Sequence, residues 1–157
     1  MKAFMDKEFM LQSPTAQHLY HAYAEGMPIC DYHCHIPPRE IYENRRFDNI
    51  AQVWLGGRNP DGSYFGDHYK WRVMRSNGVP EDYITGDKPD RERFQKFAEA
   101  LPMAIGNPMY HWTNLELHTF FGYDGVLNGD TAEEVWNLCN DKLQHDPKLT
   151  VRGLIEQ

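Results

Sequence analysis

The sequence predicts an α/β fold, of which this chain of 157 residues contains one strand and a series of helices, so the chain itself is predominantly α-helical. Residues that cap helices, with apolar residues at helical spacing between them, recur from residue 14 onward. A single short apolar segment at residues 29–36 is bounded by prolines, which is typical of a buried strand. Because a lone strand leaves its backbone groups unpaired, we interpret the chain as a fragment of a longer protein.

The first helix is expected directly before this strand. Ser13 can cap a helix over residues 14–25, and Gly26 can end it. The strand at residues 29–36 then ends at two consecutive prolines, which cannot continue a strand or a helix. One helix and one strand therefore make up the first part of the chain, residues 1–38.

Residues 39–149 are expected to form a helical subdomain. Asp48 can cap a short helix that begins near Ile50, and residues 56–66 contain so many turn formers that we predict a loop there. Residues 130–134 contain two overlapping capping boxes before an apolar stripe. The remaining helices of this region are expected at residues 67–77, 90–101, 108–121 and 131–145.

The composition excludes several classes of protein. Apolar residues make up 41% of the chain and aromatic residues 13%, which is too much for a disordered protein. The net charge of −7 disfavours binding to nucleic acid or to an anionic membrane surface. The N-terminus does not resemble a signal peptide, and no apolar run is long enough to cross a membrane. Three cysteines in no disulfide pattern, Cys30, Cys34 and Cys139, favour reduced thiols and a cytoplasmic location.

His33 and His35 form the first candidate site. Residues i and i+2 of a strand point to the same face, so the two imidazoles could bind one metal ion, and Asp31 would share that face. Imidazole suits zinc and other divalent transition metals. The structural alternative is a pair of polar side chains that are exposed or hydrogen-bonded, because short motifs of this kind often occur without function.

The second candidate site lies in the predicted helix that Asp67 would cap. His68 and Tyr69 would occupy its first turn, where the helix dipole favours an anionic ligand, and both side chains can transfer protons. Arg72 and Arg75, at positions i and i+3 of one face, could bind a carboxylate. The structural alternative places the aromatic residues in the core and the basic residues on a solvated face.

Four blocks of sequence resemble the uronate isomerase family and occur in the order found in that family. They are residues 31–38, 66–79, 105–117 and 131–136. The resemblance implies a metal-dependent (β/α)8 TIM barrel of the amidohydrolase type, whose first strand carries the two histidines and is followed by an inserted helical subdomain. Residues 150–157 would then begin the next barrel helix. The loop at residues 57–65 is longer than the family leads us to expect.

The same resemblance implies an aldose–ketose isomerase of bacterial sugar-acid catabolism. Its substrates would be D-glucuronate and D-galacturonate, and its products D-fructuronate and D-tagaturonate. His33 and His35 would bind a divalent metal, with zinc expected, and His68 and Tyr69 would contact the substrate. Arg72 and Arg75 are weaker candidates for substrate binding. The remaining ligands and the best candidate for the general base would lie in the rest of the barrel, so we expect this chain alone to be inactive.

Two other interpretations remain open at this point. A metal-dependent hydrolase of the same superfamily would share the pair of histidines but not the other blocks. A non-catalytic helical module that binds a partner would fit the helices but would not need a metal-binding strand. As partners, we expect the uronate substrate and the rest of the barrel, with no nucleic acid and no membrane. Self-association is left open.

Overall fold

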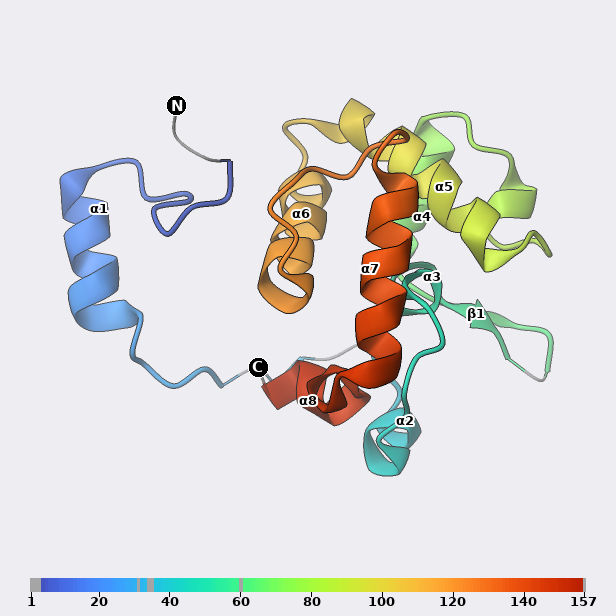
Figure 1. Cartoon of the computed structure of the whole chain (residues 1–157), viewed down its shortest axis with the longest axis horizontal. Coiled ribbons are helices and arrows are strands. Elements are labelled where there is room, and N and C mark those ends of the chain that lie inside the picture. Colours follow the sequence, from blue (N-terminus) through green and yellow to red (C-terminus); the bar gives the residue numbers. More distant parts are fainter. Residues whose placement is uncertain (1–3, 31, 34–35, 60, 157) are drawn as a thin grey trace. The chain divides into compact units, whose positions relative to one another are not determined.

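The computed structural model describes residues 4–30, 32–33, 36–59 and 61–156. It divides into two compact units, Met1–Pro37 and Pro38–Gln157. Over these described residues the chain is predominantly helical with one small two-stranded sheet (Figure 1), which confirms the predicted helical character of the chain. None of the described helices has the length and apolarity needed to cross a bilayer.

Among its described residues, the first unit contains one helix. It runs as α1, Pro14–Leu19, and continues as a π-helical segment, Tyr20–Ala24. The predicted cap is confirmed, because the Ser13 hydroxyl accepts a hydrogen bond from the backbone N–H of Ala16 at 3.1 Å. The wider π-helical turns end where the N–H of Glu25 donates to the carbonyl of Tyr20 at 2.8 Å.

The strand predicted at residues 29–36 is not formed in the residues of this segment that the structure describes. Ile29 is 93% exposed and Tyr32 is 95% exposed, so these side chains lie in solvent rather than in a core. The physical reason is that one strand cannot satisfy its backbone groups without a neighbour. Three residues of the segment, Asp31, Cys34 and His35, lie outside the described residues.

The second unit contains the other helices and the sheet. Its α-helices are α2 Pro38–Glu43, α3 Ile50–Leu55, α4 His68–Ser76, α5 Asp90–Ala100, α6 Pro108–Phe121, α7 Ala132–His145 and α8 Val151–Glu156. Three short 3-10 helices, η2 Glu81–Tyr83, η3 Leu101–Ala104 and η4 Pro147–Leu149, connect some of them. Helix α5 packs against α3, α4 and α7.

Aromatic side chains form the centre of the core around α5. Phe94 and Phe97 are fully buried on one face of this helix, as their helical spacing predicts. The ring of Trp54 on α3 stacks on Phe94 at 6.0 Å and meets Phe97 edge-on at 5.8 Å. Trp136 on α7 approaches Phe94 at 5.4 Å. These ring contacts therefore join α3 and α7 to α5.

A β-hairpin replaces the loop predicted at residues 56–66, so that prediction is wrong for part of the segment. Strands β1, Gly57–Arg58, and β2, Tyr64–Phe65, pair antiparallel and extend from the end of α3 (Figure 1). The N–H of Asn59 donates to the carbonyl of Ser63 at 2.7 Å and closes the turn. Turn-forming residues suit a hairpin connection as well as an open loop, and pairing of the flanking residues decides between the two.

Two helix caps differ from those predicted. Asn49, not Asp48, caps α3, because its side-chain oxygen accepts from the N–H of Gln52 at 3.0 Å. Thr131 occupies the cap position of α7, but it forms no side-chain capping hydrogen bond. Its hydroxyl donates instead to the carbonyl of Val126 at 2.9 Å, which fixes the preceding loop. The predicted starts of both helices are correct within a residue or two, although different groups satisfy their backbones.

Candidate functional site

The predicted metal pair lies in the first unit. His33 is exposed and belongs to no regular element, and His35 lies outside the described residues together with Asp31. Two imidazoles two residues apart are a suitable donor set for zinc, but a zinc site needs at least three protein ligands. Among the described residues, no group of three histidine, cysteine, aspartate or glutamate side chains is placed to supply such a site. The pair therefore remains a prediction that requires further ligands.

The first turn of α4 is the candidate site that the structure describes in full. Asp67 caps this helix as predicted, because its Oδ1 accepts from the backbone N–H of Tyr69 at 2.8 Å and of Lys70 at 3.4 Å. His68 and Tyr69 are both exposed, and their rings lie 4.4 Å apart between centroids. Two side chains that can transfer protons thus stand together at the positive end of a helix.

The two arginines of α4 lie in different environments. The guanidinium of Arg72 lies 5.7 Å from the ring centroid of Tyr69, so Arg72 joins the cluster at the first turn. Arg75 donates from Nε to the carboxylate of Glu81 at 2.9 Å and lies 5.9 Å from the ring of Trp71. This pairing lowers the pKa of Glu81 to about 2. The structure brings His68, Tyr69 and Arg72 together and holds Arg75 in a separate ion pair.

A hollow of about 410 Å³ lies beside Tyr69 and Arg72. Its walls come from α4, from η3 and from the start of α6, and they include Ser76, Met103 and Asn107. Sequence reasoning did not identify these last three as lining residues. The sequence predicts a helix that begins at residue 108, and Asn107 caps this helix, α6, by accepting from the backbone N–H of Met109 at 2.9 Å.

A buried ion cluster lies beneath the first turn of α4 and was also missed by sequence reasoning. Lys70 is only 4% exposed, and its ammonium lies 3.2 Å from the carboxylate of Asp67 and 3.7 Å from that of Glu116 on α6. Its Nζ also lies 5.6 Å from the ring centroid of Trp54. Burial raises the pKa of Glu116 above its usual range, although the positive charge of Lys70 opposes that shift.

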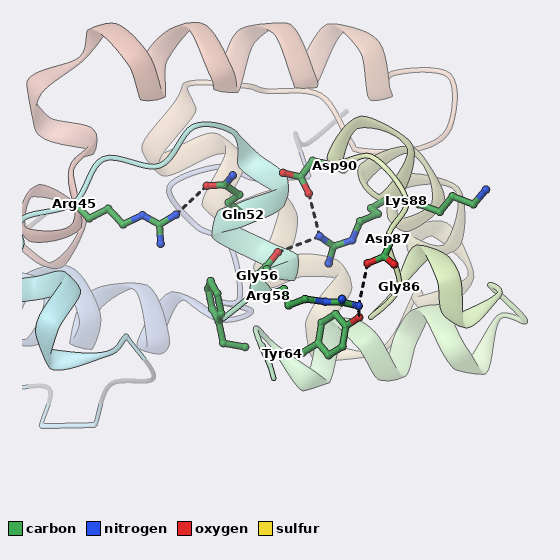
Figure 2. A pocket seen from close by; sticks show the side chains of 12 residues that line it. Arg45, Gln52, Gly56, Arg58, Tyr64, Gly86, Asp87, Lys88 and Asp90 are labelled. Carbon is green, nitrogen blue, oxygen red and sulfur yellow. Dashed lines mark hydrogen bonds and ion pairs between the residues drawn. The ribbon is translucent and has the colours of Figure 1, made fainter. Parts of the chain in front are cut away.

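A second hollow, of about 350 Å³, lies between the hairpin and the loop before α5 (Figure 2). It contains none of the residues predicted to form a site. Its charged groups are largely paired within the chain: Arg58 forms an ion pair with Asp87 at 2.9 Å and also contacts the hydroxyl of Tyr64, while Arg45 donates to Gln52 at 3.0 Å. These contacts indicate a structural role for the basic residues here.

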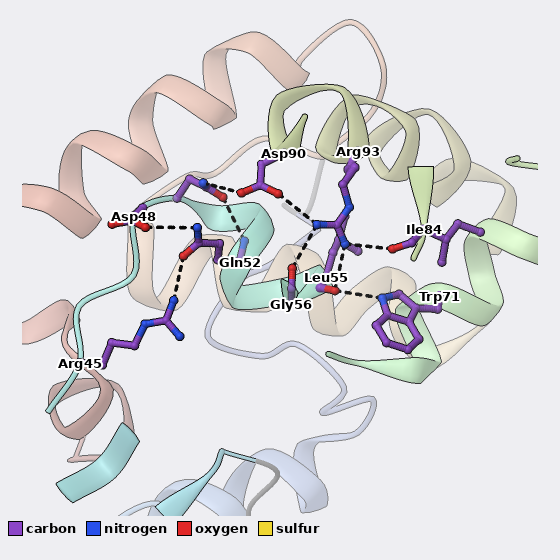
Figure 3. A network of polar contacts seen from close by, with 10 residues as sticks. Arg45, Asp48, Gln52, Leu55, Gly56, Trp71, Ile84, Asp90 and Arg93 are labelled. Carbon is purple, nitrogen blue, oxygen red and sulfur yellow. Dashed lines mark hydrogen bonds and ion pairs between the residues drawn. The ribbon is translucent and has the colours of Figure 1, made fainter. Parts of the chain in front are cut away.

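Arg93 lies under this second hollow and joins three elements (Figure 3). Its guanidinium donates to the carbonyls of Gly56 at 3.1 Å, Leu55 at 3.3 Å and Ile84 at 2.9 Å. It also forms an ion pair with Asp90 at 3.0 Å. A buried arginine that satisfies carbonyls at the end of α3 and beside η2 stabilises the fold around the hairpin.

Comparison with known proteins identifies the family. A family model for glucuronate isomerase matches residues 1–157, the whole chain. The uronate isomerase of Lachnospira eligens is 68% identical over 157 residues, which are 100% of this chain and 31% of that protein. The uronate isomerase of Caldicellulosiruptor bescii is 54% identical over 155 residues, 99% of this chain and 31% of that protein.

Solved structures agree with this result. The crystal structure of uronate isomerase from Thermotoga maritima matches with a TM-score of 0.84 and 32% identity, over 99% of this chain and 32% of that chain. Glucuronate isomerase from Caulobacter crescentus matches with a TM-score of 0.75 over 92% of this chain and 30% of that chain, and at 24% identity it supports the fold alone. The chain thus spans about a third of the length of the curated relatives it matches. Over its whole length, the chain belongs to the glucuronate isomerase family.

Proposed function

We propose that this chain is the N-terminal part of a uronate isomerase. The complete enzyme would interconvert D-glucuronate and D-fructuronate, and D-galacturonate and D-tagaturonate. The observation that supports this most strongly is the family match over residues 1–157, together with relatives named uronate isomerase at up to 68% identity. The metal-dependent hydrolase and the helical interaction module have no comparable support.

The proposal includes a (β/α)8 barrel of the amidohydrolase type, of which this chain supplies the first strand and an inserted helical subdomain. Residues 29–36 would form that strand when neighbouring strands from the rest of the enzyme pair with it. The exposure of Ile29 and Tyr32 supports this view, because large apolar side chains at a strand position normally face a core. The second unit would then be the inserted subdomain.

In this proposal His33 and His35 are two of the ligands of a divalent metal, with zinc as the expected ion. Such an ion supplies a Lewis acid that polarises the oxygens of a bound sugar. His68 and Tyr69 would contact the substrate, and Arg72 would bind its carboxylate through the guanidinium. Arg75 is the weaker candidate, because Glu81 already holds its guanidinium.

The reaction requires transfer of a proton between C1 and C2 of the sugar through an enediol. A general base removes the proton next to the carbonyl, and hydrogen-bond donors stabilise the developing oxyanion. The exposed side chains of His68 and Tyr69 in the first turn of α4 can supply such donors. We assign the general base to the part of the enzyme beyond residue 157. A cytoplasmic location is part of the proposal, supported by the free thiols of Cys30 and Cys139.

A chimeric enzyme tests this function. The chain would replace the matching segment of the Lachnospira eligens uronate isomerase, and formation of D-fructuronate from D-glucuronate would be measured by NMR. We expect turnover within about tenfold of the parent enzyme, because this chain differs from the segment it replaces at less than a third of its positions. The chain alone should show no turnover.

Two variants of the chimera test the metal pair. H33A and H35A should each lose bound zinc, measured by elemental analysis, and should lose activity by more than about a hundredfold. A variant with Ala in place of exposed His145 on α7 serves as the control and should retain both. A well-folded chimera without isomerase activity would contradict the proposed function.

A further inference from the structure

Lys70 is a buried cation that the proposed chemistry does not use. Lys70 is 4% exposed, whereas its neighbours His68 and Tyr69 on the same turn are exposed to solvent. Lysine is rarely buried unless its charge is paired, because removal of an ammonium group from water is costly. A buried lysine therefore calls for an explanation in terms of its partners.

The partners of Lys70 come from two different helices. Asp67 caps α4 itself, and its Oδ2 accepts from the ammonium at 3.2 Å. Glu116 belongs to α6, and its carboxylate lies 3.7 Å away, which is an ion pair rather than a short hydrogen bond. The ring of Trp54 from α3 approaches the same ammonium at 5.6 Å. The positive charge thus lies where α3, α4 and α6 meet.

The Asp67 carboxylate connects this buried cation to the exposed site. Its Oδ2 binds Lys70, while its Oδ1 accepts from the backbone N–H of Tyr69 at 2.8 Å. One carboxylate therefore contacts both the buried ammonium and the backbone of the turn that carries His68 and Tyr69, so the position of Lys70 affects the position of that backbone. Because Glu116 is part of α6, the same contact relates this turn to the other wall of the hollow lined by Tyr69 and Arg72.

We propose that Lys70 is a positioning residue, which links Glu116 of α6 to the Asp67 cap of α4 and so holds His68 and Tyr69 where they meet the substrate. The role of that turn in substrate binding rests on the proposed function, whereas the link between the helices does not. Misplacement of a substrate-contacting group by about 1 Å can reduce a rate about a hundredfold, so such a link can matter for turnover without touching the substrate.

The first experiment measures the link in the 157-residue chain itself. The K70M/E116Q variant removes both members of the interhelical pair, so Glu116 is not left as an unpaired carboxylate, while Asp67 keeps its backbone partners at the start of α4. We expect the backbone amide of Tyr69 to exchange with solvent about tenfold faster than in the unmodified chain, because its acceptor is no longer fixed. Amides in the middle of α5 should keep their rates.

K96M is the matched control for this measurement. It removes a lysine of α5 that forms an exposed ion pair with Glu99 of the same helix at 2.7 Å, and this ion pair includes neither Asp67 nor Glu116. The exchange of Tyr69 should be unchanged in K96M. Unchanged exchange of Tyr69 in K70M/E116Q, in a chain that keeps its α5 protection, would overturn the proposal.

The second experiment uses the chimeric isomerase and separates positioning from a purely structural role. K70M alone leaves the carboxylates of Asp67 and Glu116 without their shared cation and should destabilise the fold, while K70M/E116Q should recover much of that stability. We expect kcat to remain at least about tenfold low in both variants, with KM changed by less than about threefold. K96M should match the parent chimera.

The outcomes distinguish this inference from the proposed function. If K70M/E116Q recovers both stability and kcat, Lys70 has only a structural role and the inference is wrong. If the unmodified chimera has no isomerase activity, the proposed function fails, and the exchange of the Tyr69 amide still decides whether the link exists. Faster exchange together with a low kcat in a stable double variant supports both.

Discussion

At the scale of single residues, the ionisation of Glu116 should give the chain an unusual pH dependence. Burial raises the pKa of this carboxyl group above its usual range. A raised acid pKa means that the stabilising contribution is present below the unfolded-state pKa and is lost as pH rises through the folded-state pKa. Glu116 should therefore oppose folding increasingly as pH rises above the ordinary carboxyl pKa of about 4.3, unlike Glu81, whose pKa is lowered to about 2 by Arg75.

Replacement of Glu116 by glutamine tests this pH dependence. The stability of E116Q relative to the unmodified chain should be greater at pH 7 than at pH 4, because glutamine does not ionise. Tryptophan fluorescence during urea unfolding measures it, and all four tryptophans lie in the second unit. A difference between the two chains that is independent of pH, or that shifts in the other direction, would refute a raised pKa for Glu116.

Arg93 is expected to be the most sensitive single side chain near the hairpin. R93M would remove the side-chain donor to the carbonyls of Gly56 and Ile84 and the counter-charge of Asp90. The carbonyl of Leu55 would keep the indole N–H of Trp71 as a donor at 3.0 Å. Removal of one member of a buried ion pair commonly costs about 3–5 kcal/mol, and we expect a loss in the free energy of unfolding of that order. R39M is the control, because Arg39 forms an exposed pair with Glu43 and should cost less than about 1 kcal/mol. Similar losses in the free energy of unfolding for R93M and R39M would show that the buried contacts of Arg93 do not stabilise the fold more than an exposed ion pair does.

At the scale of elements, the glycine before the hairpin should tolerate no side chain. Gly56 has φ 66°, and a Cβ placed there would lie 1.8 Å from the carbonyl oxygen of Phe65. Gly62 in the turn also has a positive φ, 84°, but a Cβ there would meet nothing within 4 Å. G62A should therefore cost only the conformational strain of about 1–2 kcal/mol, and G56A clearly more.

Urea unfolding of the two alanine variants measures this difference. If G56A costs no more than G62A, the close approach of β2 to Gly56 would not constrain the hairpin. If both are neutral, neither positive φ angle would be required in solution. The comparison thus separates backbone strain, which both variants share, from the steric clash, which only G56A has.

The elements also show which parts of the fold could be predicted from the sequence. Helix α4 was predictable because Asp67 and the apolar spacing that follows it act locally. The hairpin was not, because turn formers between residues 57 and 65 fit either an open loop or a paired turn. The contact between Lys70 and Glu116 could not be predicted from the sequence either, because it depends on how α6 packs against α4. His68, Tyr69 and Arg72 were identified together because one helix carries all three.

At the scale of the whole molecule, the helical second unit and the segment at residues 29–36 stand in contrast. The second unit has a closed aromatic core around α5, with Phe94 and Phe97 fully buried. The segment exposes Ile29 and Tyr32 almost completely and forms no strand in its described residues. A chain that spans about a third of its relatives' length therefore folds the second unit around a buried core, while the described residues of the segment 29–36 remain exposed.

This contrast predicts where the rest of the enzyme acts on the chain. In the isolated chain, amides of Ile29 and Tyr32 should exchange nearly as fast as in an unfolded peptide, whereas amides of α5 should be protected. In the chimeric isomerase the same two amides should slow by more than about a hundredfold, because neighbouring strands then accept and donate their hydrogen bonds. Hydrogen exchange followed by mass spectrometry measures both states. Strong protection of residues 29–36 in a monomer of the isolated chain would contradict the barrel-strand assignment, because the segment would then satisfy its own backbone without the barrel.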